Sequence, residues 1–135
     1  MPEYKKQELI FLNDIYYDAK HTWVRLEGDL IRVGISDFAQ DQLGEIVFVE
    51  LPSIGDTFAK GEVFGQAESV KSVSELYIPV SGEILAVNQD IEDSPEHVNI
   101  DPYAVGWMII VKPSDLAEIK NLLSKDDYVS LLTTS

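Results

Sequence analysis

Short segments in which every second residue is apolar run through the first two thirds of the chain, and this periodicity constrains the fold more than any other feature. Alternation with a period of two places apolar side chains on one face of a β-strand. Strands are predicted at residues 22–26, 30–35, 46–51, 63–70, 73–80 and 83–87. Turns rich in Gly, Pro and Asp separate them. Short strands at this spacing are typical of a β-sandwich or barrel.

Two short helices are predicted between the strands. Ser36 can cap the first, which Gly44 would end. Ser94, followed by Pro95 at the first helical position, predicts the second. Both segments are too short to form a helical layer of their own.

A longer helix is predicted near the C-terminus, with Ser114 as its cap. Leu116, Ile119 and Leu123 recur at helical spacing, so the helix should pack an apolar stripe on the β body. Tyr128 suggests a final docked turn.

With 135 residues, 45% of them apolar, the chain is long enough for one hydrophobic core. We expect residues 1–15 to form an N-terminal extension of uncertain structure and residues 16–135 to form a single domain. No apolar run approaches the roughly 20 residues that cross a bilayer, and the N-terminus is too charged for a signal peptide. The sequence therefore predicts a soluble, cytoplasmic protein without a membrane partner.

The formal net charge of −14 repels nucleic-acid backbones and anionic lipid, so nucleic acid is not expected as a partner. Between Arg32 and Lys112, Lys60 and Lys71 are the only lysine or arginine residues, against fourteen Asp and Glu. This acidity either keeps the protein soluble or forms a docking surface for basic partners.

The chain offers few residues for catalysis. It has no cysteine, which excludes disulfides, thiolate metal sites and cysteine nucleophiles. Its two histidines, His21 and His97, belong to no metal or catalytic motif, and both are predicted to be structural, His97 as a solvated helix residue. Carboxylates are abundant, but no pair is singled out for hydrolysis. Neither an enzyme nor a metal site is expected.

One lysine is placed differently from the others. Residues 66–77 are interpreted as two strands that meet at a tight turn without glycine, with Lys71 at the tip between Val70 and Val73. A lysine at a hairpin tip is usually only solvated. Its neighbours in the sequence indicate more.

The run Glu68-Ser69-Val70-Lys71, followed by residues 77–83, resembles the lipoylation hairpin of the glycine cleavage system H-protein family. The likeness continues in residues 21–25, 33–40, 43–52, 99–103 and 106–107, and it extends from about residue 17 to about residue 132. So many matches in the same order cover nearly the whole chain.

The resemblance implies a mainly β, lipoyl-domain-like hybrid barrel-sandwich fold with short helices and a C-terminal helix. It also implies lipoate attached through an amide bond to Lys71, and no catalysis by the chain itself. The resemblance implies that a lipoylating enzyme recognises this lysine by its neighbours Glu68, Ser69, Val70 and Glu75. Gly82 would keep the next turn tight.

The partners that the resemblance implies are a pyridoxal-phosphate-dependent glycine decarboxylase, a folate-dependent aminomethyltransferase and dihydrolipoamide dehydrogenase, with a lipoylating enzyme. A carrier without cysteine cannot form a mixed disulfide with its own arm. Two alternatives stay open: an H-like lipoate carrier for another pathway, such as sulfur oxidation or lipoyl relay, and an interaction module that has lost its modification.

The chain departs from the family in the cleft that receives the loaded arm. Where the family usually has His-Glu-Trp, this chain has His21-Thr22-Trp23. In the family that glutamate helps to hold the arm, together with an acidic residue beyond the lysine, which is Glu75 here. The cleft candidates are therefore His21, Thr22 and Glu75, and weaker protection of the arm is expected.

A faint internal similarity links two segments. Residues 44–49 (Gly-Glu-Ile-Val-Phe-Val) resemble residues 82–87 (Gly-Glu-Ile-Leu-Ala-Val). Two unrelated strands that each follow a glycine turn would give this similarity, and so would a sandwich of two similar halves.

Overall fold

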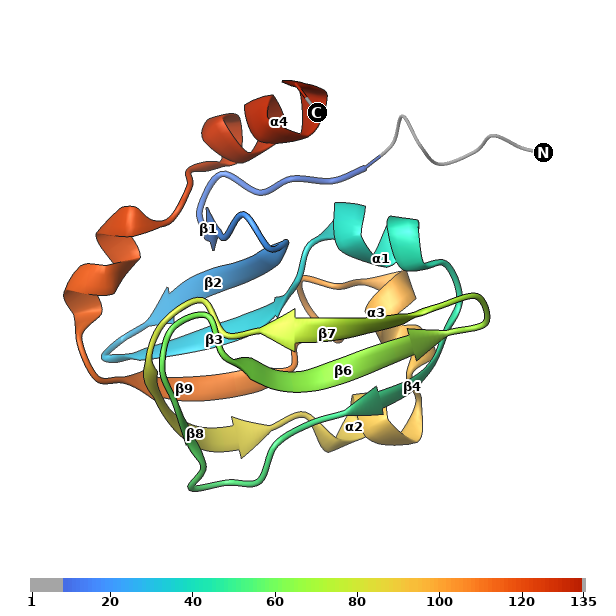
Figure 1. The fold of residues 1–135 in the computed structure, drawn as a ribbon, viewed down its shortest axis with the longest axis horizontal. Coiled ribbons are helices and arrows are strands. Elements are labelled where there is room, and N and C mark those ends of the chain that lie inside the picture. Colours follow the sequence, from blue (N-terminus) through green and yellow to red (C-terminus); the bar gives the residue numbers. More distant parts are fainter. Residues whose placement is uncertain (1–8, 135) are drawn as a thin grey trace.

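The computed structural model describes residues 9–134, and in this range the strands form two antiparallel sheets (Figure 1). A six-stranded sheet has the order β1-β2-β3-β9-β8-β5, and a three-stranded sheet has the order β4-β6-β7. The strands are β1 (Tyr16–Tyr17), β2 (Thr22–Glu27), β3 (Leu30–Ile35), β4 (Ile46–Glu50), β5 (Thr57–Phe58), β6 (Val63–Ser69), β7 (Val73–Tyr77), β8 (Gly82–Val87) and β9 (Ile109–Pro113).

Short helices surround the sheets. They are α1 (Asp37–Leu43), α2 (Gln89–Asp93), α3 (Glu96–Ile100), a 3-10 helix (Leu116–Asn121) and α4 (Lys125–Thr134). Within residues 9–134, no helix has the length and apolar character needed to cross a membrane. The predicted fold class, mainly β with short helices and a C-terminal helix, is confirmed.

All six predicted strands are present, with ends shifted by at most three residues. The sequence prediction missed β1, β5 and β9. The first two have only two residues each. The third, β9, lies between β3 and β8 inside the larger sheet, and its Ile109 and Val111 are fully buried.

The prediction for α1 is confirmed. The Ser36 hydroxyl accepts a hydrogen bond from the Ala39 N–H, and Gly44 ends the helix with φ +81°. This left-handed conformation favours glycine because it has no Cβ. The helix buries Leu43 against the core.

The prediction for Ser94 is wrong. The structure has two helices here, and Ser94 ends α2, while Pro95 precedes α3 without a side-chain cap. Asn88 caps α2 by accepting from the Asp90 N–H. The Asn88 amide also donates to two backbone carbonyls of residues 105 and 107, a tertiary contact that local sequence does not reveal.

The prediction of a single long helix after Ser114 is also wrong. Asp115 caps a 3-10 helix that ends at Asn121, and α4 starts at Lys125. The break has a tertiary cause, because Leu123 exchanges two backbone hydrogen bonds with Tyr17, at 2.7 and 2.8 Å. A residue in this extended pairing cannot continue a helix.

The core has two parts. The larger part lies between the sheets and includes Val33, Leu76 and Ile84. The smaller part is aromatic and lies under α4, where Tyr17 stacks on Tyr128 with 4.4 Å between ring centroids.

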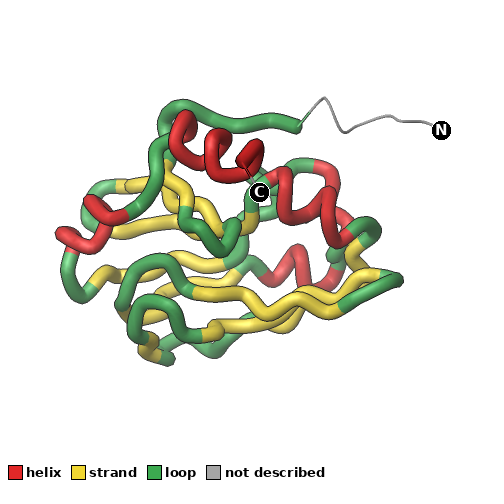
Figure 2. The backbone as a smooth tube through the Cα atoms, turned by 45° about the horizontal axis from the view of Figure 1, so that its top comes forward, coloured by secondary structure: helices red, strands yellow, loops and turns green. Residues whose placement is uncertain are grey.

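Residues 9–15 run as an extended segment beside α4 (Figure 2). Phe11 packs on the aromatic cluster, and the Tyr103 hydroxyl donates to the Ile10 carbonyl over 2.7 Å. This part of the expected extension therefore packs on the body of the protein. Residues 1–8 lie outside the described range.

The two similar segments lie in different sheets and share an irregularity. In β4 the register with β6 shifts between Ile46 and Phe48, and in β8 the register with β9 shifts between Ile84 and Ala86. These are the same positions in the two six-residue segments. A bulge at matching positions favours two similar halves over two unrelated strands.

Candidate functional site

Ser69 builds the tight turn of the β6–β7 hairpin. Its N–H donates to the Ser72 carbonyl over 2.8 Å, and its hydroxyl accepts from the N–H groups of Lys71 and Ser72 at 3.2 and 3.1 Å. A serine hydroxyl that accepts from nearby backbone amides stabilises a turn locally. This bonding explains how the turn closes without glycine.

The hairpin tip rests on the junction between α1 and β4, which passes beside it in Figure 1. The Val70 N–H donates to the Glu45 carbonyl over 3.1 Å. The Lys71 stem crosses Gly44, with Cε 3.4 Å from the position that a Cβ on Gly44 would take. Lys71 is exposed, and within residues 9–134 its amine has no hydrogen-bond or ionic partner. The backbone of the tip is therefore fixed while the amine is free.

Asn99 of α3 holds this junction. Its Oδ1 accepts from the Ile46 N–H at 2.9 Å, and its Nδ2 donates to the Gly44 carbonyl and to Gln40 Oε1, both at 2.8 Å. One side chain thus satisfies two backbone groups on either side of the turn between α1 and β4. Sequence reasoning placed Asn99 only within a matching run, and did not identify this role.

A groove of about 420 Å³ lies beside the hairpin, between α1, the start of β2 and the start of β7. The three predicted cleft residues, His21, Thr22 and Glu75, all line it, together with the apolar side chains Ile35, Phe38, Leu43, Val73 and Leu76. Ser72, the residue after Lys71, also lines the groove. The structure thus brings together residues that are more than fifty positions apart in the sequence.

His21 enters the groove from a left-handed backbone conformation, with φ +76°, which is unusual for a residue other than glycine. Its Nδ1 lies 2.7 Å from the Tyr128 hydroxyl, and its ring packs on Phe38 with 5.1 Å between centroids. Burial lowers the pKa of His21 below its ordinary value; Asp18 opposes this shift and Lys20 adds to it. The imidazole is therefore neutral at pH 7.

Thr22 is the buried polar residue of the groove, with 1% of its surface exposed. Its Oγ1 has no hydrogen-bond partner among residues 9–134. An unpaired buried hydroxyl is costly, so it marks a position where a bound group could supply the missing partner.

His97 was predicted to be a solvated residue, and this is wrong. Its side chain is half-buried, and its Nδ1 is buried without a partner in the described part of the chain. His97 does not line the groove.

Glu75 lies at the rim, exposed to solvent. The Tyr77 hydroxyl donates to its Oε1 over 3.1 Å, which raises the pKa of Tyr77. The Lys20 ammonium lies 5.1 Å from the centre of the Tyr77 ring. The carboxylate and a cation thus share one edge of the groove.

The other predicted recognition residues are spread more widely. Val70 is 68% exposed at the tip, and Glu68 is half-buried in β6, opposite Val73. Gly82 is buried in β8, where a Cβ would collide with the carbonyl oxygen of Lys112. The structure therefore gives Gly82 a packing requirement, away from the hairpin tip.

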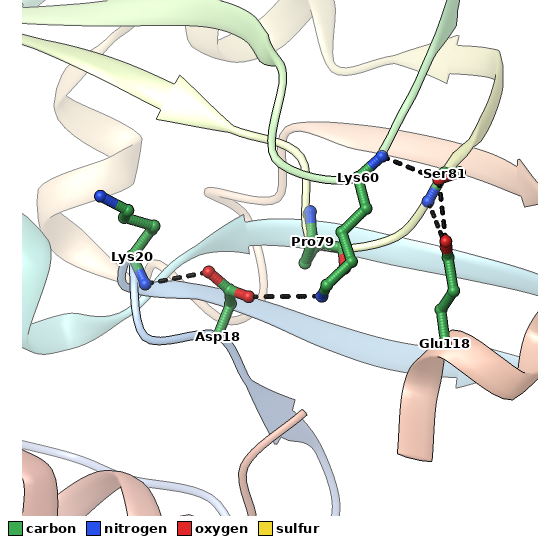
Figure 3. Close-up of polar contacts among 6 residues, drawn as sticks. All are labelled: Asp18, Lys20, Lys60, Pro79, Ser81 and Glu118. Atoms are coloured by element: carbon green, nitrogen blue, oxygen red, sulfur yellow. Dashed lines mark hydrogen bonds and ion pairs between the residues drawn. The ribbon is translucent and has the colours of Figure 1, made fainter. Parts of the chain in front are cut away.

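Lys60, the other isolated lysine, is bound to its surroundings (Figure 3). Its amine donates to the Pro79 carbonyl over 2.7 Å and pairs with Asp18 at 3.7 Å. Its N–H donates to the Ser81 hydroxyl, and Glu118 accepts from both the N–H and the hydroxyl of Ser81. Lys60 is a structural residue, unlike Lys71.

The profile of the family described as "Glycine cleavage H-protein" matches residues 15–135. This chain belongs to the glycine cleavage H-protein family. The curated glycine cleavage system H protein of Halalkalibacterium halodurans is 51% identical over 121 residues, covering 90% of this chain and 94% of that protein. The one from Bacillus licheniformis is 53% identical over 119 residues, covering 88% and 94%.

A solved structure agrees with the H-protein assignment. The crystal structure of a glycine cleavage system H protein from Mycobacterium marinum has a TM-score of 0.84 and 38% identity, over 90% of this chain and 98% of that chain. The family and fold predicted from the sequence are thereby confirmed. In the H-protein family the chain is a lipoyl carrier and not the catalyst, as the sequence also predicted.

Sequence reasoning missed one residue that contacts the groove residue His21 in this H-protein fold. Tyr128 was assigned only to a docked turn, yet its hydroxyl bonds both His21 and Ser36. No local signal in the sequence could have paired residues 107 positions apart.

Proposed function

We propose that this chain carries lipoate on Lys71 and moves an aminomethyl group derived from glycine among the enzymes of the glycine cleavage system. The observation that carries the proposal is the state of Lys71: an exposed, unpaired amine on a turn that Ser69 and Glu45 hold in place. A firm turn with a free amine lets an attached chain swing while its origin stays fixed.

The proposed partners are glycine decarboxylase, the folate-dependent aminomethyltransferase, dihydrolipoamide dehydrogenase and a lipoylating enzyme. Tethering replaces free diffusion with a high effective concentration at each partner, which suits a group that three enzymes share. Exchange between dithiol and disulfide needs an environment that does not oxidise thiols, so we place the carrier in the cytoplasm. Relatives above 50% identity are glycine cleavage H proteins, so a carrier for another pathway is not favoured.

The groove fits an attached lipoyl chain. Its volume of about 420 Å³ is within the range of small-molecule pockets, roughly 300–1,000 Å³. Phe38, Leu43 and Leu76 would cover the hydrocarbon part, and Thr22 Oγ1 offers an unpaired polar atom. Lipoate would supply the dithiol and disulfide chemistry, while the chain would bind and shield the arm between transfers.

The attachment is tested by intact-mass measurement after co-expression with a lipoylating enzyme and supplied lipoate. The wild-type chain is expected to gain one lipoyl group. Lys71→Arg should gain none and keep its fold, because an exposed side chain at the tip contributes little to stability. Lys60→Arg, the matched control at the other isolated lysine, should be modified like the wild type. Modification that persists in Lys71→Arg contradicts the proposal.

A further inference from the structure

A chain of hydrogen bonds runs from α1 through α4 to the groove. The Ala39 N–H donates to Ser36 Oγ over 3.1 Å, Ser36 Oγ lies 2.8 Å from the Tyr128 hydroxyl, and that hydroxyl lies 2.7 Å from His21 Nδ1. Ser36 and Tyr128 are fully buried. Water is therefore not available to satisfy a group that the chain leaves unpaired.

Only one direction of donation along this series of hydrogen bonds gives every donor group an acceptor. Ser36 Oγ accepts from the Ala39 N–H, so its own hydrogen needs an acceptor, and the Tyr128 oxygen is the one in reach. The Tyr128 hydrogen then goes to His21 Nδ1. Nδ1 carries no hydrogen in this arrangement, and the neutral imidazole has its hydrogen on Nε2.

The reverse direction is costly. If Nδ1 donated to Tyr128, Tyr128 would donate to Ser36. The Ser36 hydrogen would then lose the one acceptor that residues 9–134 offer it, in a fully buried position. A buried donor without a partner loses its solvation with nothing in return. Burial also disfavours the imidazolium form, which would force this direction.

The position of the His21 ring depends on α4. Tyr128 is held by stacking on Tyr17 and by an edge contact with Phe11, at 4.4 and 5.9 Å between centroids. With Nδ1 bound to this fixed hydroxyl and the ring packed on Phe38, Nε2 is the ring nitrogen left for a molecule in the groove.

We propose that His21 is a positioning residue for the arm, and that Tyr128 of α4 sets it as a hydrogen-bond donor through Nε2–H. The partner on the arm is an acceptor atom, which is either the amide oxygen next to Lys71 or a sulfur at the far end. This inference rests on the proposed attachment at Lys71. It assigns α4, which lies outside the groove, a role in how long the arm stays there.

The first test uses the unloaded protein and does not depend on lipoylation. Long-range ¹H–¹⁵N correlation NMR should show His21 as a single tautomer, with Nδ1 unprotonated and Nε2 protonated. Tyr128→Phe should lose this fixed tautomer, whereas Tyr16→Phe, the same change at an exposed tyrosine of β1, should keep it. A hydrogen on Nδ1 in the wild type overturns the proposal.

The second test compares octanoyl-loaded and lipoyl-loaded protein, since octanoate keeps the amide oxygen but lacks both sulfurs. A change in the His21 Nε2 signal in both forms identifies the amide oxygen as acceptor, and a change with lipoate alone identifies a sulfur. If the His21 Nε2 signal changes in neither loaded form, the positioning role is overturned. If no mass is gained at Lys71, the proposed function fails, while the tautomer test still stands.

A kinetic readout completes the test. Reduction of the arm by a water-soluble phosphine should be about two- to tenfold faster in Tyr128→Phe, the factor that corresponds to one lost hydrogen bond. His21→Asn removes the imidazole but tolerates the left-handed backbone, so it should fold and show the same increase. Rates equal to those of the wild type and of Tyr16→Phe in both variants overturn the proposal.

Discussion

Thr22 lines the groove with an uncharged side chain, at the position where the resemblance to the family leads us to expect a glutamate. A carboxylate facing the positive amine of a loaded arm would make a charge-assisted hydrogen bond worth roughly 1.5–3 kcal/mol. The remaining acidic group, Glu75, lies at the exposed rim and already accepts from Tyr77, with Lys20 above that ring. The loaded arm should therefore leave this groove more readily than it would leave a groove with a glutamate at position 22.

The prediction for Thr22 concerns the decay of the aminomethyl-loaded form. Thr22→Glu is expected to slow the decay by about tenfold or more, the factor that corresponds to a charge-assisted hydrogen bond. Thr22→Gln introduces a side chain of the same size as glutamate but without its charge, and it should change the decay rate little. Decay is followed by mass without folate or transferase, and equal decay in all three proteins would show that the missing carboxylate has no effect.

His21 should make stability depend on pH. Its pKa is lowered on folding, so between its ordinary value of 6.5 and its folded value the unfolded chain binds more protons. The contribution of the neutral imidazole to the free energy of unfolding is thus complete above about pH 6.5, and is lost as the pH falls below it. Asp18 and Lys20 are the charged groups that act on the ring, and Tyr128 and Phe38 contact it without charge.

The corresponding measurement is urea unfolding at pH 7 and pH 5.5. His21→Asn should lose less stability than the wild type over this interval, because the group that takes up the proton is absent. His97→Asn serves as the control for removing a histidine outside the groove. An unchanged pH dependence in His21→Asn would mean that other groups account for it.

At the scale of elements, the hairpin depends on a junction made elsewhere in the chain. β6 and β7 supply the turn, α1 and β4 supply the surface under it, and Asn99 of α3 connects the two sides of that surface. A flexible junction would let the tip move. The firmness of the hairpin is thus a property of five elements together.

Asn99→Asp tests this arrangement with almost no change in shape. The carboxylate can still accept from the Ile46 N–H, but it cannot donate to the Gly44 carbonyl or to Gln40. The free energy of unfolding should fall by about 1–3 kcal/mol, because the part-buried Gly44 carbonyl and Gln40 Oε1 lose their donor and a charge faces them. Urea unfolding measures this fall, and Asn121→Asp at an exposed position should cost little. Equal stability of the two variants would exclude a bracing role for Asn99.

At the scale of the whole molecule, acidity dominates the charge. Both arginines lie over tryptophan rings, Arg25 over Trp23 and Arg32 over Trp107, at 4.9 and 4.6 Å from the ring centres. Arg32 is also paired with Glu27. Amide formation at Lys71 would remove one positive charge and take the formal charge from −14 to −15.

We therefore expect exchange with the decarboxylase to slow as salt rises, because exposed charges are screened over about 8 Å at physiological ionic strength. Transfer rates measured from low to high salt give the slope. Glu45→Gln, beside the tip, should reduce the rate at low salt more than Asp126→Asn on α4, which removes the same charge elsewhere. Rates independent of salt would show that the acidity serves solubility alone.

The sequence by itself determined the parts of this protein that are written locally. Alternating apolar residues placed six strands, Ser36 and Gly44 placed both ends of α1, and the run around Lys71 identified the hairpin and the family. These features depend on backbone preferences and side chains within a few residues of each other, so a linear pattern carries them.

The tertiary structure decided what depends on distant contacts. Pairing of Leu123 with Tyr17 broke the predicted C-terminal helix, and a central place between two strands made residues 109–113 a strand. The hydrogen bond that holds the His21 ring required His21 and Tyr128 to meet across 107 residues. Such contacts form only when burial of the whole core brings the elements together, because no local segment gains enough from them to fix its conformation alone.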